Sequence, residues 1–398
     1  MLVALNSNGN YVSLLDGWNR EELEKLRKKE SFQCPACKEN VRLKLGYQKA
    51  FHFAHQSGTE CSSNTEPETN FHLEGKKQLY QWLSLQYKDV RLEYYLSNIS
   101  QRPDVYVETD NQKFAIEFQC SQISSEVFHK RTKRYLEAKI TPIWILGADW
   151  IKNKSDHLQS LTSFEWQFAS NIELHKTPTI PYYNPLSKEF IIITNLQPFS
   201  SKTTFCTKYK YKQNQLPLKK LLTINSPLKS YPVEWRNQKI RFRLQFSTFP
   251  YPQYKRILNA LYMKRIPPFI IPAEAGIPIS SGYWIETPIV IWQLWLLLDN
   301  IISIQIGEII SFDSVYTSLL RRISMGDIII RKFPLILKNA HFSFVVLEYL
   351  TILSELGVLK KINKTNFKKV RDLYCPSNEE EINKYESNLA NYLKRRWS

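Results

Sequence analysis

Four cysteine and histidine residues near the start of the sequence have the spacing of a metal site. Cys34 and Cys37 form a C-x2-C pair, and His55 and Cys61 follow shortly after it. A C-x2-C turn presents two thiolates to one ion, and a later His and Cys can complete the closed tetrahedron of a structural Zn²⁺ site. His52 lies three residues before His55, so the two face opposite sides of an extended chain and one of them binds. We expect His55 as the ligand, with His52 as the alternative.

The C-x2-C pair has two other interpretations, a reduced thiol pair without metal and a redox motif of the thioredoxin type. The redox motif needs a strand-to-helix junction, whereas the residues around Cys34 and Cys37 are typical of short strands. Four protein ligands leave no open position for a water molecule. The pattern therefore favours a structural zinc site over a catalytic one.

A second group of polar residues has the order expected of a Mg²⁺ or Mn²⁺ site. Glu74 lies on a predicted helix, Asp104 lies in the segment RPDV between predicted strands, and Glu117 and Gln119 lie on one strand. Residues two apart on a strand point to the same face. Mg²⁺ prefers carboxylate oxygens and retained waters. An ion held here would activate a water for in-line attack on a phosphodiester.

Glu117 is the most informative of these residues, since Ala115, Ile116 and Phe118 make its strand apolar. Burying a carboxylate in such a strand is costly unless the group is paired or bound to a metal. The alternative is an ordinary alternating strand with Glu117 and Gln119 on its solvated face. The carboxylates that precede it in the chain favour the metal site.

The pattern of apolar residues predicts the elements that position these groups. Residues 2–15 predict a hairpin around the turn Asn8-Gly9, and residues 21–30 a charged helix. A polar linker, 62–70, places a domain boundary near residue 66. The next block predicts a helix at 71–87, strands at 91–96, 105–109 and 114–120, a helix at 126–139 and a buried strand at 142–147.

The charge of the chain is unevenly distributed. In 398 residues, 54 Lys and Arg exceed 37 Asp and Glu, and the formal net charge of +17 favours a polyanionic partner such as nucleic acid. Between Lys202 and Arg265, ten Lys and five Arg accompany the single acid Glu234, a net charge of +14. The aromatic residues among them are Phe205, Tyr209, Tyr211, Tyr231, Trp235, Phe242, Phe246, Phe249, Tyr251 and Tyr254. Cations and stacking rings together hold single-stranded DNA; the alternative is that these rings form a core whose surface the cations solvate.

The composition also excludes several classes of protein. Six Cys are too few for a disulfide-stapled secreted scaffold, and the first residues lack the pattern of a signal peptide. The most apolar stretch, Ile289 to Leu298, is too short to span a membrane. We therefore expect a cytoplasmic protein without membrane insertion. Beyond Pro267 the pattern is mainly helical, and residues 337–367 predict two helices and a basic hairpin, an order that suits a winged-helix module.

In their order along residues 1–160, the motifs resemble those of the CoiA-like competence proteins. They are the N-terminal hairpin, CPAC, HFAH, HLEGK, RPDV, IEFQCSQIS, a basic helix and IWILG. The central block is similar to the PD-(D/E)XK nuclease fold. The resemblance implies that Asp104 is the PD aspartate, Glu117 the (D/E) residue and Glu74 the carboxylate of the first helix. It also implies a cytoplasmic role in natural transformation, where incoming single-stranded DNA is processed or recombined.

The sequence departs from this family pattern at Gln119, which stands where the nuclease fold usually has a lysine. A lysine there positions the attacking water and stabilises negative charge, whereas glutamine can orient water but carries no charge. Lys130 or Arg131 on the next helix could supply the cation. His72 lies two residues before Glu74, so it does not share that helical face, and we expect a capping or surface residue.

The sequence thus predicts an α/β protein with a PD-(D/E)XK nuclease-like core. The expected parts are a hairpin and zinc-finger-like module (1–65), the nuclease-like domain (66–160), a basic, aromatic-rich DNA-binding segment (161–265) and a helical C-terminal domain (266–398). The expected function is Mg²⁺- or Mn²⁺-dependent cleavage of incoming single-stranded or branched DNA that promotes recombination, with DNA and recombination proteins as partners. The alternatives are a non-catalytic DNA-binding recombination factor that retains an inactive nuclease fold and, more remotely, an RNA-directed factor.

Overall fold

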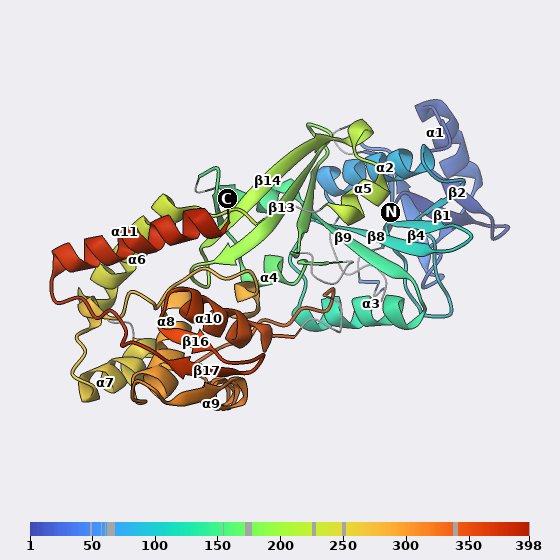
Figure 1. Cartoon of the computed structure of the whole chain (residues 1–398). Coiled ribbons are helices and arrows are strands. Elements are labelled where there is room, and N and C mark those ends of the chain that lie inside the picture. Colours follow the sequence, from blue (N-terminus) through green and yellow to red (C-terminus); the bar gives the residue numbers. More distant parts are fainter. Residues whose placement is uncertain are drawn as a thin grey trace.

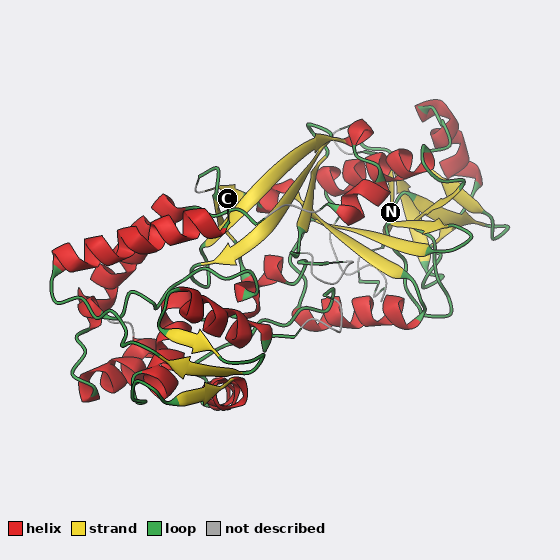
Figure 2. Ribbon diagram, viewed as in Figure 1, coloured by secondary structure: helices red, strands yellow, loops and turns green. Residues whose placement is uncertain are grey.

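The computed structural model describes residues 1–47, 50–56, 58, 59, 61, 68–153, 155–171, 177–224, 228–248, 252–336 and 341–397. Within them the chain forms sheets of five, nine and three strands along an elongated molecule (Figure 1). Helices flank the long central sheet and dominate the C-terminal half (Figure 2). The domain boundary expected near residue 66 lies outside the described residues.

The five-stranded sheet belongs to the N-terminal module and has the strand order β2-β1-β3-β4-β5. Its strands are β1 (Val3–Asn6), β2 (Tyr11–Ser13), β3 (Phe32–Gln33), β4 (Asn40–Lys44) and β5 (His52–His55), and α1 spans Arg20–Lys29. The predicted hairpin is present as β1 and β2, and Gly9 turns it with φ of +77°, a conformation that glycine adopts without strain. Helix α1 begins with a capping box between Asn19 and Glu22.

The nine-stranded sheet has the order β10-β11-β14-β13-β12-β9-β8-β7-β6. Its strands are β6 (Asp89–Leu92), β7 (Val105–Glu108), β8 (Lys113–Gln119), β9 (Thr141–Gly147), β10 (Lys152–Asn153), β11 (Leu158–Ser160), β12 (Ile180–Asn184), β13 (Glu189–Pro198) and β14 (Thr204–Lys212). The helices of this part are α2 (Asn70–Ser84), α3 (Ser125–Glu137), α4 (Ser163–Trp166) and α5 (Leu218–Thr223). Strands β8 and β9 pair in parallel, which requires a crossover, and α3 provides it.

The predicted segment 161–265 is divided between two parts of the fold. Strands β12 to β14 continue the central sheet, because β12 pairs with β9, while the helices that follow belong to the C-terminal half. Of the aromatic residues in that segment, Phe205, Tyr231, Trp235 and Phe246 are buried in the largest hydrophobic core. For these four rings the alternative interpretation holds, in which the aromatic residues form a core and do not stack on DNA. Phe249 and Tyr251 lie outside the described residues.

Helices α2 and α3 lie on opposite faces of the sheet at β8 (Figure 1). Phe118 packs under α2, where a Cβ added at Gly75 would lie 2.0 Å from its ring. Residues 115 and 117 point the other way, toward α3. Strand β8 is buried from Phe114 to Gln119, so the solvated face proposed as the alternative for Glu117 is absent here.

The C-terminal half contains α6 (Pro232–Thr248), α7 (Lys255–Met263), α8 (Ile289–Leu296), α9 (Phe312–Ser324), α10 (Phe344–Glu355) and α11 (Glu379–Arg396), with β15 (Ile309–Ser311), β16 (Leu359–Lys361) and β17 (Asn366–Lys369). A π-helical turn, Leu297–Ile301, extends α8, and short 3₁₀ helices span Ala148–Trp150, Gln213–Gln215, Pro252–Tyr254, Pro268–Ile270 and Gly282–Trp284. None of the helices in the described part of the chain has both the length and the apolar character needed to cross a membrane.

From α8 to β17 the element order is helix, strand, two helices and a two-stranded hairpin, with β17 between β15 and β16. This is the arrangement of a winged-helix module. The expectation of two helices within residues 337–367 differs from the structure, because the described part of that range holds one helix, α10, before the hairpin. The helix that precedes α10 is α9, which ends before this range.

Candidate functional site

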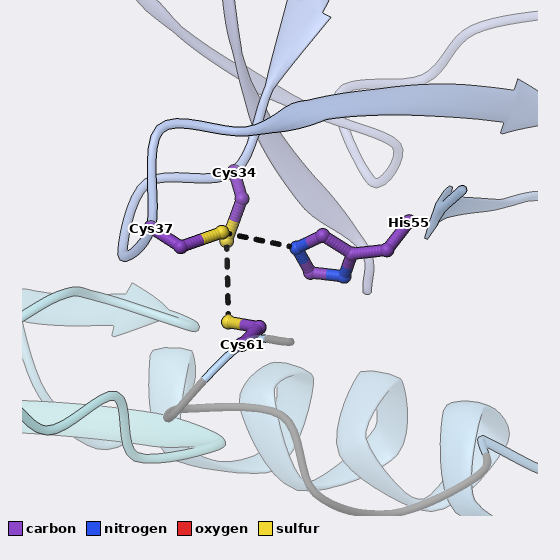
Figure 3. Close-up of side chains that lie close together, drawn as sticks. All are labelled: Cys34, Cys37, His55 and Cys61. Carbon is purple, nitrogen blue, oxygen red and sulfur yellow. Dashed lines mark hydrogen bonds between the residues drawn. The ribbon is translucent and has the colours of Figure 1, made fainter. Parts of the chain in front are cut away.

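Cys34, Cys37, His55 and Cys61 converge in the N-terminal module, and their ligand atoms all lie within 4.8 Å of one another. Cys34 and Cys37 come from the turn between β3 and β4, His55 ends β5, and Cys61 follows it (Figure 3). The Cys34 and Cys61 Sγ atoms are 4.0 Å apart, and Cys37 Sγ lies 3.3 Å from His55 Nε2. This set of ligands could hold a metal ion such as zinc.

The surroundings of the cluster suit a bound cation. Burial and the neighbouring Cys34 raise the pKa of Cys37 to about 12, although a backbone N–H lowers it in part. Burial opposes ionisation of Cys34 too, but backbone N–H groups and Arg102 bring its pKa below the usual value. Several thiolates side by side repel one another, and a divalent ion removes that repulsion. His52 lies apart, with Nδ1 2.9 Å from the carbonyl of Ala50.

Asp104 and Glu117 lie side by side at the open end of the β7–β8 hairpin, away from its turn. The register pairs Val105 with Ile116, which places Asp104, one residue before β7, beside the end of β8. Its Oδ2 accepts a hydrogen bond of 2.8 Å from the backbone N–H of Phe118. The two motifs RPDV and AIEFQ thus place the carboxylates of Asp104 and Glu117 next to each other.

Glu117 is buried, with 3% of its surface exposed, against α3. Its Oε1 accepts hydrogen bonds from Arg131 Nη2 at 2.5 Å and from the Tyr135 hydroxyl at 2.6 Å. Burial raises the pKa of Glu117 to about 7, Arg131 acts against that rise, and Asp104 adds to it. Of the two cations suggested to replace the missing lysine, Arg131 is the one in contact with this carboxylate.

Asp104 faces two residues of α2 one turn apart, His72 and Lys76. Lys76 Nζ lies 3.7 Å from Asp104 Oδ1, and His72 Nε2 lies 3.5 Å from Asp104 Oδ2. Burial opposes the ionisation of Asp104, but Lys76 and His72 outweigh it and lower the pKa to about 2. His72 Nε2 is buried without a hydrogen-bond partner, and the expected surface or cap position for His72 is wrong because its side chain faces inward to Asp104.

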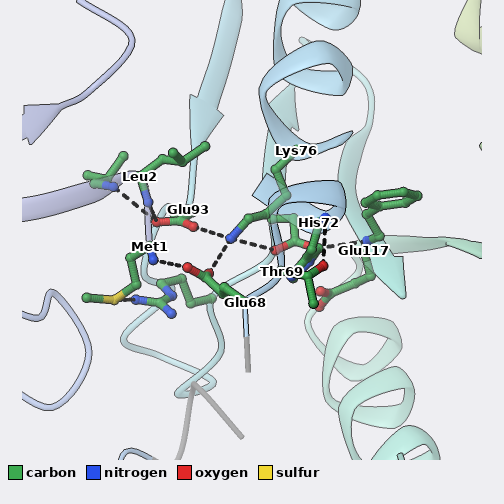
Figure 4. A network of polar contacts seen from close by, with 12 residues as sticks. Met1, Leu2, Glu68, Thr69, His72, Lys76, Glu93 and Glu117 are labelled. Atoms are coloured by element: carbon green, nitrogen blue, oxygen red, sulfur yellow. Dashed lines mark hydrogen bonds and ion pairs between the residues drawn. The ribbon is translucent and has the colours of Figure 1, made fainter. Parts of the chain in front are cut away.

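Lys76 is the centre of a buried ionic network (Figure 4). Its Nζ contacts Glu68 Oε1 and Glu93 Oε1, each at 2.5 Å. Glu93 follows β6 with φ of +48° and accepts the backbone N–H groups of Leu2 and Val3. The strand predicted at 91–96 therefore ends at Leu92, since the chain turns at Glu93 to pair with α2 and the N-terminal strand.

Glu74 and Gln119 have other neighbours. Glu74 accepts a hydrogen bond of 2.8 Å from Gln78 and lies 3.9 Å from Lys77, with its side chain 41% exposed. It lines a cavity of about 500 Å³ between α2 and the N-terminal module. Gln119 is buried on the Glu117 side of β8, where its Nε2 donates to the carbonyl of Ser121 at 2.7 Å.

Four members of this site were not predicted from the sequence: His72, Lys76, Glu93 and Tyr135. The spacing of four between His72 and Lys76 in HLEGK indicates a shared helical face and is the one sequence signal that could have identified them. Glu93 and Tyr135 carry no such signal, because their roles depend on contacts with residues distant in the sequence.

Comparison with known proteins gives matches along most of the chain. Models of three domains of competence protein CoiA match it: the N-terminal domain at residues 15–64, the nuclease-like domain at 68–226 and the C-terminal domain at 231–382. Competence protein CoiA of Bacillus subtilis (strain 168) is 33% identical over 285 residues, which cover 70% of this chain and 74% of that protein. The nuclease-like match ends at residue 226 and so includes β12 to β14.

Proposed function

The chain belongs to the CoiA family of competence proteins, and on that premise we propose that it is a Mg²⁺- or Mn²⁺-dependent nuclease acting on incoming DNA in the cytoplasm. The observation that carries the proposal is the pair of neighbouring carboxylates at the open end of the β7–β8 hairpin, the partly buried Asp104 and the buried Glu117. The order α2, β6, β7, β8, α3, β9 around the pair supports a PD-(D/E)XK-like core.

The residues around this pair fit a divalent cation. Both hydrogen bonds to Glu117 end on Oε1, so Oε2 remains as a ligand, and Asp104 adds a second carboxylate. The buried Nε2 of His72 lies 3.5 Å from Oδ2 of the same aspartate, too far for a normal hydrogen bond. When bound, such an ion supplies an activated water and neutralises charge on the phosphate.

The protein's own groups would support hydrolysis in distinct ways. Arg131 holds Glu117 in place and adds positive charge beside the reacting phosphate. Gln119 orients the attacking water through its carboxamide. The substrates would be single-stranded or branched DNA, and the products would serve recombination, with recombination proteins as partners.

Zinc in the Cys34, Cys37, His55 and Cys61 cluster would be structural, because four protein ligands close the coordination sphere. The cluster also touches the central domain, since Arg102 Nη1 lies 3.8 Å from Cys34 Sγ. Zinc would therefore fix the N-terminal module against the segment that carries Asp104.

One observation favours a second function, that of a non-catalytic DNA-binding recombination factor. Both carboxylates already have cationic neighbours, Lys76 at Asp104 and Arg131 at Glu117, and Gln119 carries no charge. Ion-paired carboxylates of this kind also occur as structural supports.

Incubation with single-stranded, duplex and branched DNA, with Mg²⁺, Mn²⁺ or a chelator, separates the two functions. Metal-dependent cleavage supports the nuclease, and binding of DNA without cleavage supports the factor. Glu74→Gln belongs in the same series, because the sequence assigns Glu74 to the site whereas its contacts are with Gln78 and Lys77. We expect this variant to retain cleavage.

A further inference from the structure

A second polar cavity lies on the outer side of α3, away from the carboxylate pair. Its volume is about 670 Å³, within the range of about 300–1,000 Å³ typical of small-ligand sites. It is lined by Ser125, Glu126, His129, Lys130 and Lys133 of α3, by Ser163, Trp166 and Gln167 around α4, and by Glu286, Ile330, Arg331 and Lys332 from the C-terminal half. Three parts of the chain that are distant in the sequence thus build it together.

Arg331 is the unusual member of this cavity. It is buried, with 5% of its surface exposed, and its guanidinium lies 4.2 Å from the centre of the Trp166 ring. Its Nη1 donates to the carbonyls of Tyr283 and Ile285. Nε and Nη2 are buried without an acceptor, and Glu286 is the carboxylate whose charge acts on this side chain.

Two other residues that line this cavity also carry unpaired buried atoms. Trp166 Nε1 is a buried donor without an acceptor, and Gln167 Oε1 is a buried acceptor without a donor. Native proteins satisfy nearly all such groups. A purely structural role for Arg331 explains the bonds of Nη1 but not the unpaired nitrogens. Three donors without acceptors thus belong to two residues that line this cavity, Arg331 and Trp166, and a ligand rich in acceptor oxygens would suit them.

The charge of the cavity fits an anion. Lys130, Lys133, Arg331 and Lys332 outnumber Glu126 and Glu286. Lys130 and Lys332 are exposed at its rim. Burial lowers the pKa of Arg331 to about 9, and the nearby carboxylate of Glu286 offsets only part of that shift. A guanidinium presents its N–H groups as a planar fork that matches the oxygens of a phosphate.

We infer that this cavity binds a phosphate group, carried by a DNA strand or by a free nucleotide, with Arg331 as the buried anchor and Lys130 and Lys332 at the rim. The assignment of the phosphate to a DNA strand rests on the proposed function, whereas the phosphate site itself does not. Arg131, the next residue of α3 after Lys130, contacts Glu117. A strand held here would therefore lie against the helix that borders the carboxylate pair.

The test measures binding by the full-length protein in a chelator, so that no cleavage takes place. The probes are a fluorescent single-stranded oligonucleotide, titrated at several salt concentrations, and dAMP, followed by the shift in thermal unfolding temperature. The variants are Arg331→Gln and the rim pair Lys130→Ala with Lys332→Ala. The matched control, Lys28→Ala with Lys29→Ala on α1, removes the same charge from exposed positions elsewhere.

If the source is a DNA strand, we expect the rim variant to bind the oligonucleotide about tenfold more weakly, with a salt dependence reduced by about 1.4 in log–log slope for two lost phosphate contacts. If the source is a free nucleotide, dAMP raises the unfolding temperature of the natural protein but not of the rim variant or Arg331→Gln. The inference would be overturned if the oligonucleotide affinity and the dAMP-induced shift in unfolding temperature were the same in the natural protein, the rim variant and the α1 control. The rim residues are exposed, so this result does not depend on whether Arg331→Gln folds. In a parallel incubation with Mg²⁺ or Mn²⁺, binding without cleavage by the natural protein would count against the proposed function alone.

Discussion

Arg131 Nη2 lies 2.5 Å from Glu117 Oε1, and this ion pair ties α3 to the buried strand β8. The carboxylate is 3% exposed, so the pair is shielded from water and the partners depend on each other.

Replacing Arg131 with alanine leaves a buried carboxylate without its cation. Removing one partner of a buried ion pair typically costs about 3–5 kcal/mol, and we expect a loss of that order in the free energy of unfolding. Saturating Mn²⁺ should recover part of the loss, because the ion replaces the missing positive charge at Glu117. Urea denaturation with and without Mn²⁺ measures both effects. Arg134→Ala is the control, because Arg134 lies on the same helix while Glu117 accepts its hydrogen bonds from Arg131 and Tyr135. A deficit that Mn²⁺ leaves unchanged would contradict metal binding by Glu117.

Replacing Glu93 with glutamine tests the ionic network of Lys76. Glu93 is 1% exposed and contacts Lys76 at 2.5 Å, so we expect a loss of about 3 kcal/mol in the free energy of unfolding at neutral pH. Burial opposes ionisation of Glu93, yet Lys76 lowers its pKa to about 2. A carboxylate with a lowered pKa binds fewer protons in the folded state, so its contribution is complete above its usual pKa of about 4.5 and is lost as the pH falls toward 2.

The measurement for Glu93 is the difference in unfolding free energy between the natural protein and Glu93→Gln across that pH range. The difference should shrink as the pH falls below about 4.5. A difference that stays constant with pH would mean that Glu93 acts through shape and hydrogen bonds alone.

Replacing Gly75 with alanine tests the packing of α2 on β8. Alanine favours a helix over glycine by about 1 kcal/mol, but the new Cβ would lie 2.0 Å from the Phe118 ring. Overpacking of this kind typically costs about 1–3 kcal/mol, so we expect a net loss of stability. Combining Gly75→Ala with Phe118→Leu should cost less than the sum of the two single changes. Additive losses in thermal or urea unfolding would show that the two residues do not compete for space.

Zinc in the N-terminal cluster has a direct chemical test. Protein purified after growth with zinc should contain one zinc ion per chain, and Cys37→Ser and His55→Ala should lose it together with part of the thermal stability. His52→Ala is the matched control, because His52 bonds to the carbonyl of Ala50 outside the cluster. Equal loss of zinc in the two histidine variants, or natural protein free of zinc, would contradict the assignment.

The zinc-type cluster and the central α/β order were predictable because their signals are local. A C-x2-C turn and alternating or continuous apolar runs need only neighbouring residues to be recognised. The same applies to Asp104 and Glu117, whose motifs flank one hairpin. The comparison with known proteins supports the family that these motifs indicated.

The parts that the sequence did not predict depend on distant contacts. Glu93 looks like a residue inside a strand, and only the meeting of β6 with the N-terminal strand and α2 makes it an ion-pair partner. Arg331 lies outside every motif, and its burial against Trp166 arises where the C-terminal half meets the central sheet. The high charge of residues 202–265 also suggested more exposed positive surface than the structure has. Lys239 and Arg243 are buried and form ion pairs with Glu386 of α11.

We propose that Asp104 and Glu117 form a metal-dependent nuclease centre. Its most direct test is the cleavage of single-stranded DNA with Mn²⁺ by the natural protein, Asp104→Asn and Glu117→Gln, all purified in parallel. We predict cleavage by the natural protein and a loss of at least about a hundredfold in each variant, the scale on which losing one charge-stabilising group slows such reactions. Equal cleavage by all three proteins, or DNA binding without cleavage by the natural protein, would contradict the claim.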